Sequence, residues 1–165
     1  MFVRFAPPVA HHFVYSLKDR KVRELMPAKF FEGNGRFSPD GKWIVFQATD
    51  TGRPEIYVMP YPALDGKWQI SVKGGVQPQW RRDGKEIFFV DFDGTIMGVE
   101  IKSFHPFAAG NPVPLFLSPI IATRSSPTEY DVSADGKRFL INSRIEDVKE
   151  VPLVLVNNWQ VGLKK

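Results

Sequence analysis

Short apolar segments follow Asp-Gly dipeptides at three places in this chain, at 44–46, 87–89 and 139–141. In the first two, apolar side chains occupy consecutive positions, so a β-strand there has apolar side chains on both faces. A strand of this kind is buried between two layers, whereas a strand with one face in water alternates between apolar and polar residues. The pattern therefore predicts the middle strands of sheets that stack face to face.

The stretch around each Asp-Gly dipeptide also repeats. Residues 37–46 read FSPDGKWIVF, and related stretches return at 80–89 as WRRDGKEIFF and at 132–141 as VSADGKRFLI. An Asp-Gly dipeptide favours a tight hairpin, because Gly tolerates positive φ and Asp accepts hydrogen bonds from the amides that follow. The turn glycines Gly41, Gly84 and Gly136 are 43 and 52 residues apart. A repeat of about 40 to 45 residues with several strands is typical of β-propeller blades.

The pattern predicts one all-β domain over residues 1–165. We expect blades or parts of blades, each of up to four antiparallel strands, at about 11–25, 30–73, 76–118 and 128–158, in a partial propeller or a small ring of about four blades. A longer excursion at 103–112 precedes the last strand of the unit at 76–118. The candidate strands are 2–5, 13–17, 21–25, 35–38, 43–48, 55–61, 67–72, 77–80, 86–91, 95–101, 114–118, 129–132, 138–142 and 153–157.

Composition agrees with a turn-rich β-protein. The chain has 13 Gly, 14 Pro and 13% aromatic residues, and no long run of helix formers at helical spacing. The net charge of +4 comes from basic and acidic residues spread along the chain, which argues against a nucleic-acid partner. No apolar run approaches the ~20 residues of a membrane helix, and Pro7-Pro8 interrupts the segment where an export signal would lie. We expect a soluble chain without membrane insertion.

The repeats resemble those of a known family. The stretch 37–42 followed by 44–46, and the later 56–59, resemble the repeats of the TolB-like, WD-related β-propellers of bacteria, and the resemblance covers about 11–160. The second copy departs from it by Arg81-Arg82 in place of Ser-Pro, and the third by Ala134 in place of Pro. The tail 156–165 resembles the C-terminal end of propellers linked to bacterial serine/threonine kinases. The resemblance implies a docking or sensing surface in a larger bacterial protein, which is periplasmic or otherwise extracytoplasmic if the parent resembles the family.

Three and a half units do not close a ring by count. An open blade would expose several hundred Å2 of apolar surface, and burying 400 Å2 is worth about 10 kcal/mol. The N-terminal strands could complete a four-bladed ring, two chains could pair as a homodimer through their open faces, or further blades could belong to a longer parent. We favour the last arrangement, with self-association of the isolated chain.

The sequence carries no recognisable catalytic motif. It has no Gly-x-Ser-x-Gly elbow, no glycine-rich nucleotide loop and no cysteine, so we expect no enzyme activity, no cofactor and no metal. His11 and His12 point to opposite faces of a strand and are expected to be exposed polar residues. Asp91 and Asp93 are explained by a hairpin turn better than by a calcium site. The alternative function is an accessory propeller that gates a prolyl-oligopeptidase-type hydrolase, whose catalytic domain would lie elsewhere.

The candidate binding residues are expected just before the innermost strands, where a propeller places the mouth of its central channel. They are polar groups suited to a protein loop or a small polar ligand. The six predicted residues are Asn34, Arg36, Gln77, Gln79, Glu129 and Tyr130.

Overall fold

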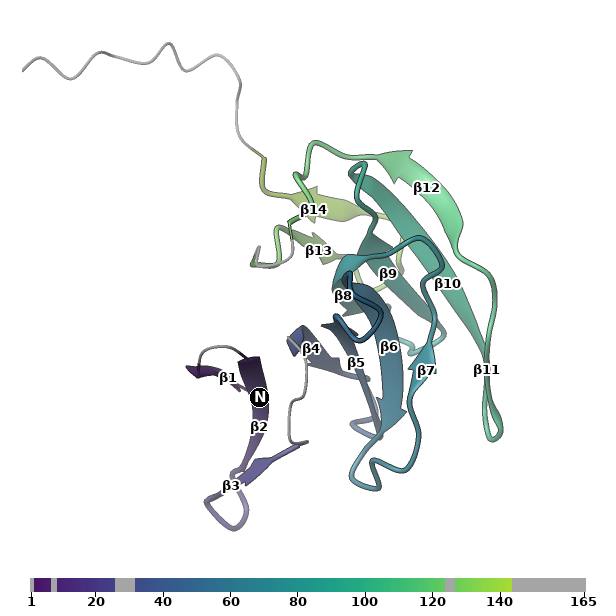
Figure 1. Cartoon of the computed structure of the whole chain (residues 1–165). Helices are drawn as coiled ribbons and strands as arrows, with labels where there is room; N and C mark the ends of the chain where they lie inside the picture. The colour runs from purple at the N-terminus through teal and green to yellow at the C-terminus, as the bar shows by residue number, and fades with distance from the viewer. Residues whose placement is uncertain (1, 7–8, 26–31, 124–126, 144–165) are drawn as a thin grey trace, which may run out of the picture.

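All regular structure in the described residues is β-strand. The computed structural model describes residues 2–6, 9–25, 32–123 and 127–143, which form fourteen strands in four antiparallel groups. The groups are arranged as a fan around the inner strands β4, β8 and β13 (Figure 1). No helix in this part of the chain is long and apolar enough to cross a membrane. The all-β propeller class predicted from the sequence is confirmed for these residues.

The sheets follow one another in chain order. The first has the order β1-β2-β3, the second β4-β5-β6-β7 and the last β13-β14. The third has the order β11-β10-β9-β8, with β12 also paired to β10. The strands are β1 (Phe2–Ala6), β2 (Val9–Ser16), β3 (Lys21–Glu24), β4 (Glu32–Phe37), β5 (Trp43–Ala48), β6 (Glu55–Pro60), β7 (Trp68–Gln69), β8 (Val76–Trp80), β9 (Glu86–Val90), β10 (Thr95–Phe104), β11 (Phe107–Ala109), β12 (Val113–Leu117), β13 (Tyr130–Val132) and β14 (Phe139–Ile141).

The middle strands are buried on both faces, as their apolar runs predict. All six residues of β5 are buried, and in β9 only Glu86 is partly exposed. Alternate side chains of β9 face different neighbours. Phe89 belongs to the core shared with β5, while Phe88 belongs to the core shared with β13 and β14. Each middle strand therefore joins the sheet before it to the sheet after it.

The excursion predicted at 103–112 is a β-hairpin rather than an irregular loop. β10 continues to Phe104 and turns back into β11, so the hairpin extends beyond the sheet that carries it (Figure 1). Phe104 and Phe107 lie against Trp43 of the preceding sheet, with ring centroids 5.1 and 5.3 Å away. Phe107 also contacts Trp68 at 5.0 Å. The hairpin thus covers the outer part of the sheet β4–β7.

Two further sequence expectations need correction. β7 spans only two residues, where a strand over 67–72 was expected, because the segment after it is bound by side chains instead of a strand partner. His12 was expected to be exposed, but only 3% of its surface is accessible and its ring meets Phe46 edge-on at 6.3 Å. The sheet β1–β3 covers this face of β5, so His12 belongs to an interface between sheets.

Closure by the N-terminal strands is not seen in the described residues. β1 to β3 pair only with one another, and β13 pairs only with β14. β2 contacts β4, whereas β13 and β14 lie beyond the third sheet (Figure 1). The expected strand 153–157 and the tail 156–165 lie outside the described residues, and the blade boundaries remain a prediction.

The three Asp-Gly turns share one geometry but use different side chains. The turn glycines have φ of 70°, 73° and 72°. In the first turn the Ser38 hydroxyl donates to Asp40 at 2.6 Å, and Ser133 and Asp135 repeat this contact in the third. These hydrogen bonds lower the pKa of both carboxyl groups. In the second turn the guanidinium of Arg81 replaces the serine and lowers the pKa of Asp83.

Acid should weaken the fold through these turns. A carboxyl group whose pKa is lower in the folded than in the unfolded chain stabilises the fold above its unfolded pKa, and that contribution is lost as the pH falls through the folded pKa. We expect the urea midpoint of the wild type to fall as the pH drops below the ordinary Asp value of 3.8. The triple variant Asp40→Asn, Asp83→Asn and Asp135→Asn should show a shallower fall, because Asn keeps the turn acceptor without the charge. An equal fall of the urea midpoint with pH in the wild type and the triple variant would contradict the stabilising role of these carboxylates.

The aromatic contacts between the β10–β11 hairpin and the sheet β4–β7 should contribute to stability. Phe107 is partly buried, so Phe107→Ala should lower the free energy of unfolding by about 2 kcal/mol, less than for a fully buried ring. The control is Leu140→Ala, since Leu140 is 76% exposed, and it should change stability by less than about 0.5 kcal/mol. Urea unfolding followed by tryptophan fluorescence measures both. Equal effects would mean that the hairpin does not stabilise the sheet pair.

Candidate functional site

Five of the six predicted site residues occupy equivalent positions in the repeats, and Tyr130 follows Glu129 directly. Asn34, Gln77 and Glu129 each lie seven residues before the turn glycine, and Arg36 and Gln79 lie five before it. The inner strands β4 and β8 both contain a bulge here, between Gly33 and Arg36 and between Val76 and Gln79. The bulge residues Asn34 and Gln77 have φ of 50° and 56°. The repeat therefore places the same bulge in the inner strands of two successive sheets.

Four of the six residues belong to a hydrogen-bond network with a buried centre. The Oε1 of Gln47 accepts from Asn34 Nδ2 and from the Gln77 amide, both at 3.0 Å. The Gln77 side chain accepts from the Glu129 amide at 2.9 Å and donates to its carboxylate at 3.1 Å. The Tyr130 hydroxyl donates to the Gln77 carbonyl at 2.9 Å. The network connects β4, β5, β8 and β13.

The centre of the network is buried, whereas Asn34 and Glu129 at its ends are partly exposed. Gln77 is 0% exposed and Tyr130 is 4% exposed. Burial raises the pKa of the Tyr130 hydroxyl, which keeps it protonated as a hydrogen-bond donor. Sequence reasoning missed Gln47, although it is a polar residue inside an apolar strand and was visible as such.

Arg36 and Gln79 face a different space, an open pocket of about 330 Å3 near the Asp-Gly turns. Arg36 donates to the Thr128 hydroxyl at 3.0 Å, and Gln79 donates to the Tyr130 carbonyl at 3.3 Å. We call this space the inner-strand pocket. It is lined by Arg36, Phe37, Pro39, Gln79, Trp80, Arg82, Val132 and Ala134. The six predicted residues therefore lie close together but divide into a buried network and an accessible pocket, and their role in binding remains a prediction.

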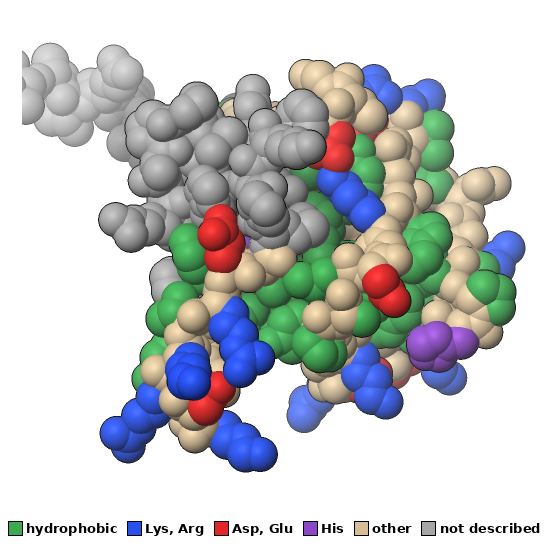
Figure 2. Space-filling model, turned by 60° about the horizontal axis from the view of Figure 1, so that its bottom comes forward, with side chains coloured by type: hydrophobic (Ala, Val, Ile, Leu, Met, Phe, Trp, Pro, Cys, Tyr) green, Lys and Arg blue, Asp and Glu red, His purple; other side chains and the backbone are tan. Residues whose placement is uncertain are grey.

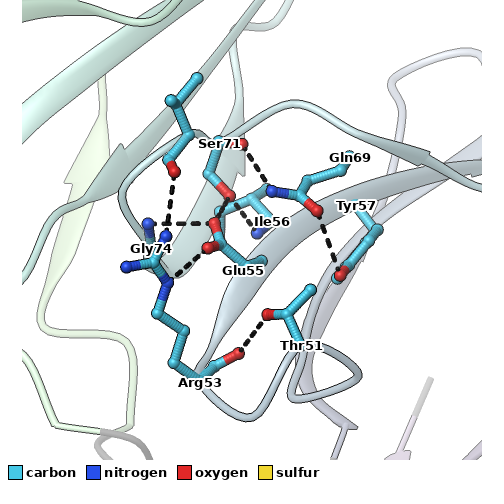
Figure 3. Close-up of polar contacts among 9 residues, drawn as sticks. Thr51, Arg53, Glu55, Ile56, Tyr57, Gln69, Ser71 and Gly74 are labelled. Atoms are coloured by element: carbon cyan, nitrogen blue, oxygen red, sulfur yellow. Dashed lines mark hydrogen bonds and ion pairs between the residues drawn. The ribbon is translucent and has the colours of Figure 1, made fainter.

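A buried carboxylate fixes the segment that leads into β8. Glu55 is 1% exposed and accepts from Arg53 Nε at 2.7 Å, from the Gly74 amide at 3.0 Å and from the Ser71 hydroxyl (Figure 3). Arg53 also donates to the Val72 carbonyl at 3.0 Å. These bonds replace strand pairing over 71–74. They hold the chain where it crosses from one sheet to the next, three residues before Gln77.

A second pocket of about 390 Å3 lies beside this crossover. Asp91 and Asp93 line it, but both serve the β9–β10 turn, as predicted. The Asp91 carboxylate accepts from the Asp93 amide at 2.7 Å, and Asp93 accepts from the Thr95 amide at 2.8 Å. Burial raises the pKa of Asp91, and hydrogen bonding by Thr95 lowers that of Asp93. In the part of the chain that the structure covers, no three His, Cys, Asp or Glu side chains are grouped to hold a metal ion.

The basic residues of the β2–β3 hairpin form an exposed projection (Figure 2). Arg23 pairs with Asp19 at 2.9 Å, and the hydroxyl of Ser16 is the main cause of a lowered pKa at Asp19. Every residue from Leu17 to Glu24 is exposed. This surface fits a solvated strand edge, which discourages unwanted pairing.

Removing the Glu55 carboxylate should loosen the crossover. Glu55→Ala leaves the Gly74 amide and the Ser71 hydroxyl without their acceptor, and we expect a loss of about 3 kcal/mol. Ser71→Ala should cost about 1 kcal/mol. The control Glu100→Ala removes an exposed carboxylate and should cost less than about 0.5 kcal/mol. Urea unfolding measures all three, and similar values for Glu55→Ala and Glu100→Ala would contradict this role.

No protein-family model and no curated protein sequence matches the chain. Solved structures do match its fold. TolB from Acinetobacter baumannii aligns with a TM-score of 0.67 and 17% identity over 88% of this chain and 35% of TolB. A protein assigned as TolB from Agrobacterium tumefaciens aligns at 0.55 and 18% identity, over 69% of this chain and 43% of that one. An oligogalacturonate lyase from Vibrio parahaemolyticus aligns at 0.51 and 12% identity, over 84% of this chain and 35% of that one.

The chain spans less than half the length of each of these proteins. At such low identity the likeness establishes the fold and not the activity. Together with the antiparallel sheets stacked around their inner strands, it identifies the described part of this chain as a partial β-propeller of the TolB-like fold.

Proposed function

We propose that the chain is a non-catalytic binding module that recognises a segment of a partner protein at the inner-strand pocket. The observation that carries the proposal is the placement of Arg36 and Gln79 in an open pocket, next to a hydrogen-bond network that connects the strands bearing them. Polar groups held rigidly beside accessible space bind with little loss of conformational entropy. The pocket also lies at the centre of the fan, where propellers carry their channel.

The wider setting is part of the same proposal. The chain spans about a third of the TolB structure it matches, which supports a module within a larger bacterial protein. The TolB-like fold supports an extracytoplasmic site for that protein, and the resemblance of 156–165 supports a kinase-linked parent. Self-association of the isolated chain would follow from exposed apolar side chains such as Leu140 and Leu117, which are 76% and 72% exposed.

A rival function is enzymatic, because one of the structures with this fold is a lyase. We infer no such activity, since the polar groups of the inner-strand pocket are two guanidinium groups and an amide, with neither a carboxylate nor an imidazole to move a proton. Incubation with oligogalacturonate should release no unsaturated product. Any turnover by the wild-type chain would favour the enzymatic alternative.

A selection from a phage-displayed random peptide library tests the binding proposal. Peptides retained by the immobilised chain should bind the double variant Arg36→Ala/Gln79→Ala at least about tenfold more weakly, because two polar contacts are lost. The matched control is Lys42→Ala/Lys85→Ala, which removes two exposed cations outside the pocket lining and should change affinity less than about twofold. Unfolding midpoints establish that each variant is folded. Failure to enrich any peptide, or equal binding to the pocket variant, would overturn the proposal.

A further inference from the structure

The inner-strand pocket is built from matching positions of three repeats. The first repeat contributes the side chains five, four and two residues before its turn glycine, which are Arg36, Phe37 and Pro39. The second contributes Gln79, Trp80 and Arg82 from the same three positions, and the third contributes Val132 and Ala134 from the last two. Differences between repeats at these positions therefore change the pocket directly.

The second repeat departs from the others by two adjacent arginines, and the structure explains only one of them. Arg81 stands where the other repeats have Ser38 and Ser133, and it performs their task by bonding to Asp83 at 2.7 and 2.9 Å. It also pairs with Glu86 at 2.8 Å. Arg82 makes no hydrogen bond or ion pair within the described residues and lines the pocket where the other repeats have Pro39 and Ala134.

The pocket contains a second cation with spare donors. Arg36 donates to the Thr128 hydroxyl at 3.0 Å and to the Gly35 carbonyl at 3.3 Å, so three of its five N–H groups remain for other acceptors. No carboxylate is among the residues that line the pocket. Two guanidinium groups facing one space without a counter-charge favour a ligand that supplies a carboxylate, which arginine binds with paired hydrogen bonds.

Three apolar side chains line the pocket together with the polar groups. They are Phe37, Trp80 and Val132, and the Trp80 indole N–H is donated to the Arg36 carbonyl at 3.3 Å. Their accessible parts offer apolar contacts to a carboxylate carried on a peptide segment, contacts that a free, fully hydrated anion does not make. A volume of about 330 Å3 is at the small end for ligand pockets, and it suits a few side chains of one segment.

We propose that the inner-strand pocket binds an acidic peptide segment, whose side-chain carboxylates pair with Arg36 and Arg82 while its apolar side chains contact Phe37 and Trp80. The inference rests on the proposed binding function and adds the chemistry of the partner. Arg82 is a specificity residue in this site, and it was not among the residues predicted from the sequence.

Fluorescence anisotropy with the full 165-residue chain tests the inference. The probe is a labelled, capped nonapeptide with two glutamates two positions apart among leucine and valine, and its counterpart carries glutamine in place of both. The acidic peptide should bind at least about tenfold more tightly than the glutamine peptide, and Arg82→Ala should weaken it about tenfold. The matched control is Lys85→Ala, in the same hairpin but outside the pocket lining, which should change affinity less than about twofold. Raising the salt concentration should weaken the acidic peptide selectively.

Each other outcome overturns the inference. Equal binding of the two peptides, or equal effects of Arg82→Ala and Lys85→Ala, would mean that carboxylate recognition at Arg82 is absent. Displacement of the peptide by inorganic phosphate beyond what sodium chloride of the same ionic strength achieves would indicate a site for free anions. If phage selection yields peptides that depend on Arg36 but lack acidic residues, the binding function stands and the acidic specificity fails. If it yields none, the binding function itself fails.

Discussion

Burial of the middle strands on both faces is the constraint on which the rest of this structure depends. A single sheet of this kind cannot bury its own apolar faces, so it needs neighbouring sheets to cover them. β5 and β9 solve this by placing alternate side chains into the cores on either side, so that each sheet supplies half of its neighbour's interior. The segment that connects two sheets must then have a defined position. Glu55 fixes it through the Gly74 amide, and the amide of Gln77, in the next inner strand β8, binds Gln47.

Local features of the fold could be predicted from the sequence, because their causes lie within a few residues. The Asp-Gly turns form where expected, since the serine or arginine that binds each aspartate is adjacent in the chain. β5 covers the predicted range 43–48. The β10–β11 hairpin was read as a loop, because Phe104 and Phe107 become buried only against Trp43, which lies about 60 residues earlier. The burial of His12 likewise depends on Phe46, from another sheet.

At the candidate site too, the sequence predicted which residues lie near one another but not how buried each side chain is. The sequence placed Asn34, Gln77 and Glu129 near one another, and the structure joins Asn34 to Gln77 through Gln47 and joins Gln77 directly to Glu129. Spacing could not show that Gln77 is inaccessible, because its burial results from the approach of three sheets. Spacing also could not show that Arg82, and not Arg81, lines the pocket. Their difference depends on the direction of each side chain, toward the turn aspartate or toward the pocket.

Departures from a repeat carry information about function when the fold does not need them. The third copy keeps its serine and replaces proline by Ala134, which leaves the turn bonds intact. The second copy replaces both residues, and Arg81 alone restores the bonds that serine supplied. Arg82 then adds an exposed charge at a position where the other repeats have proline and alanine, and it makes no hydrogen bond or ion pair in the described chain. Under the proposed function, that charge is available to a carboxylate of the bound segment, which arginine engages with paired hydrogen bonds.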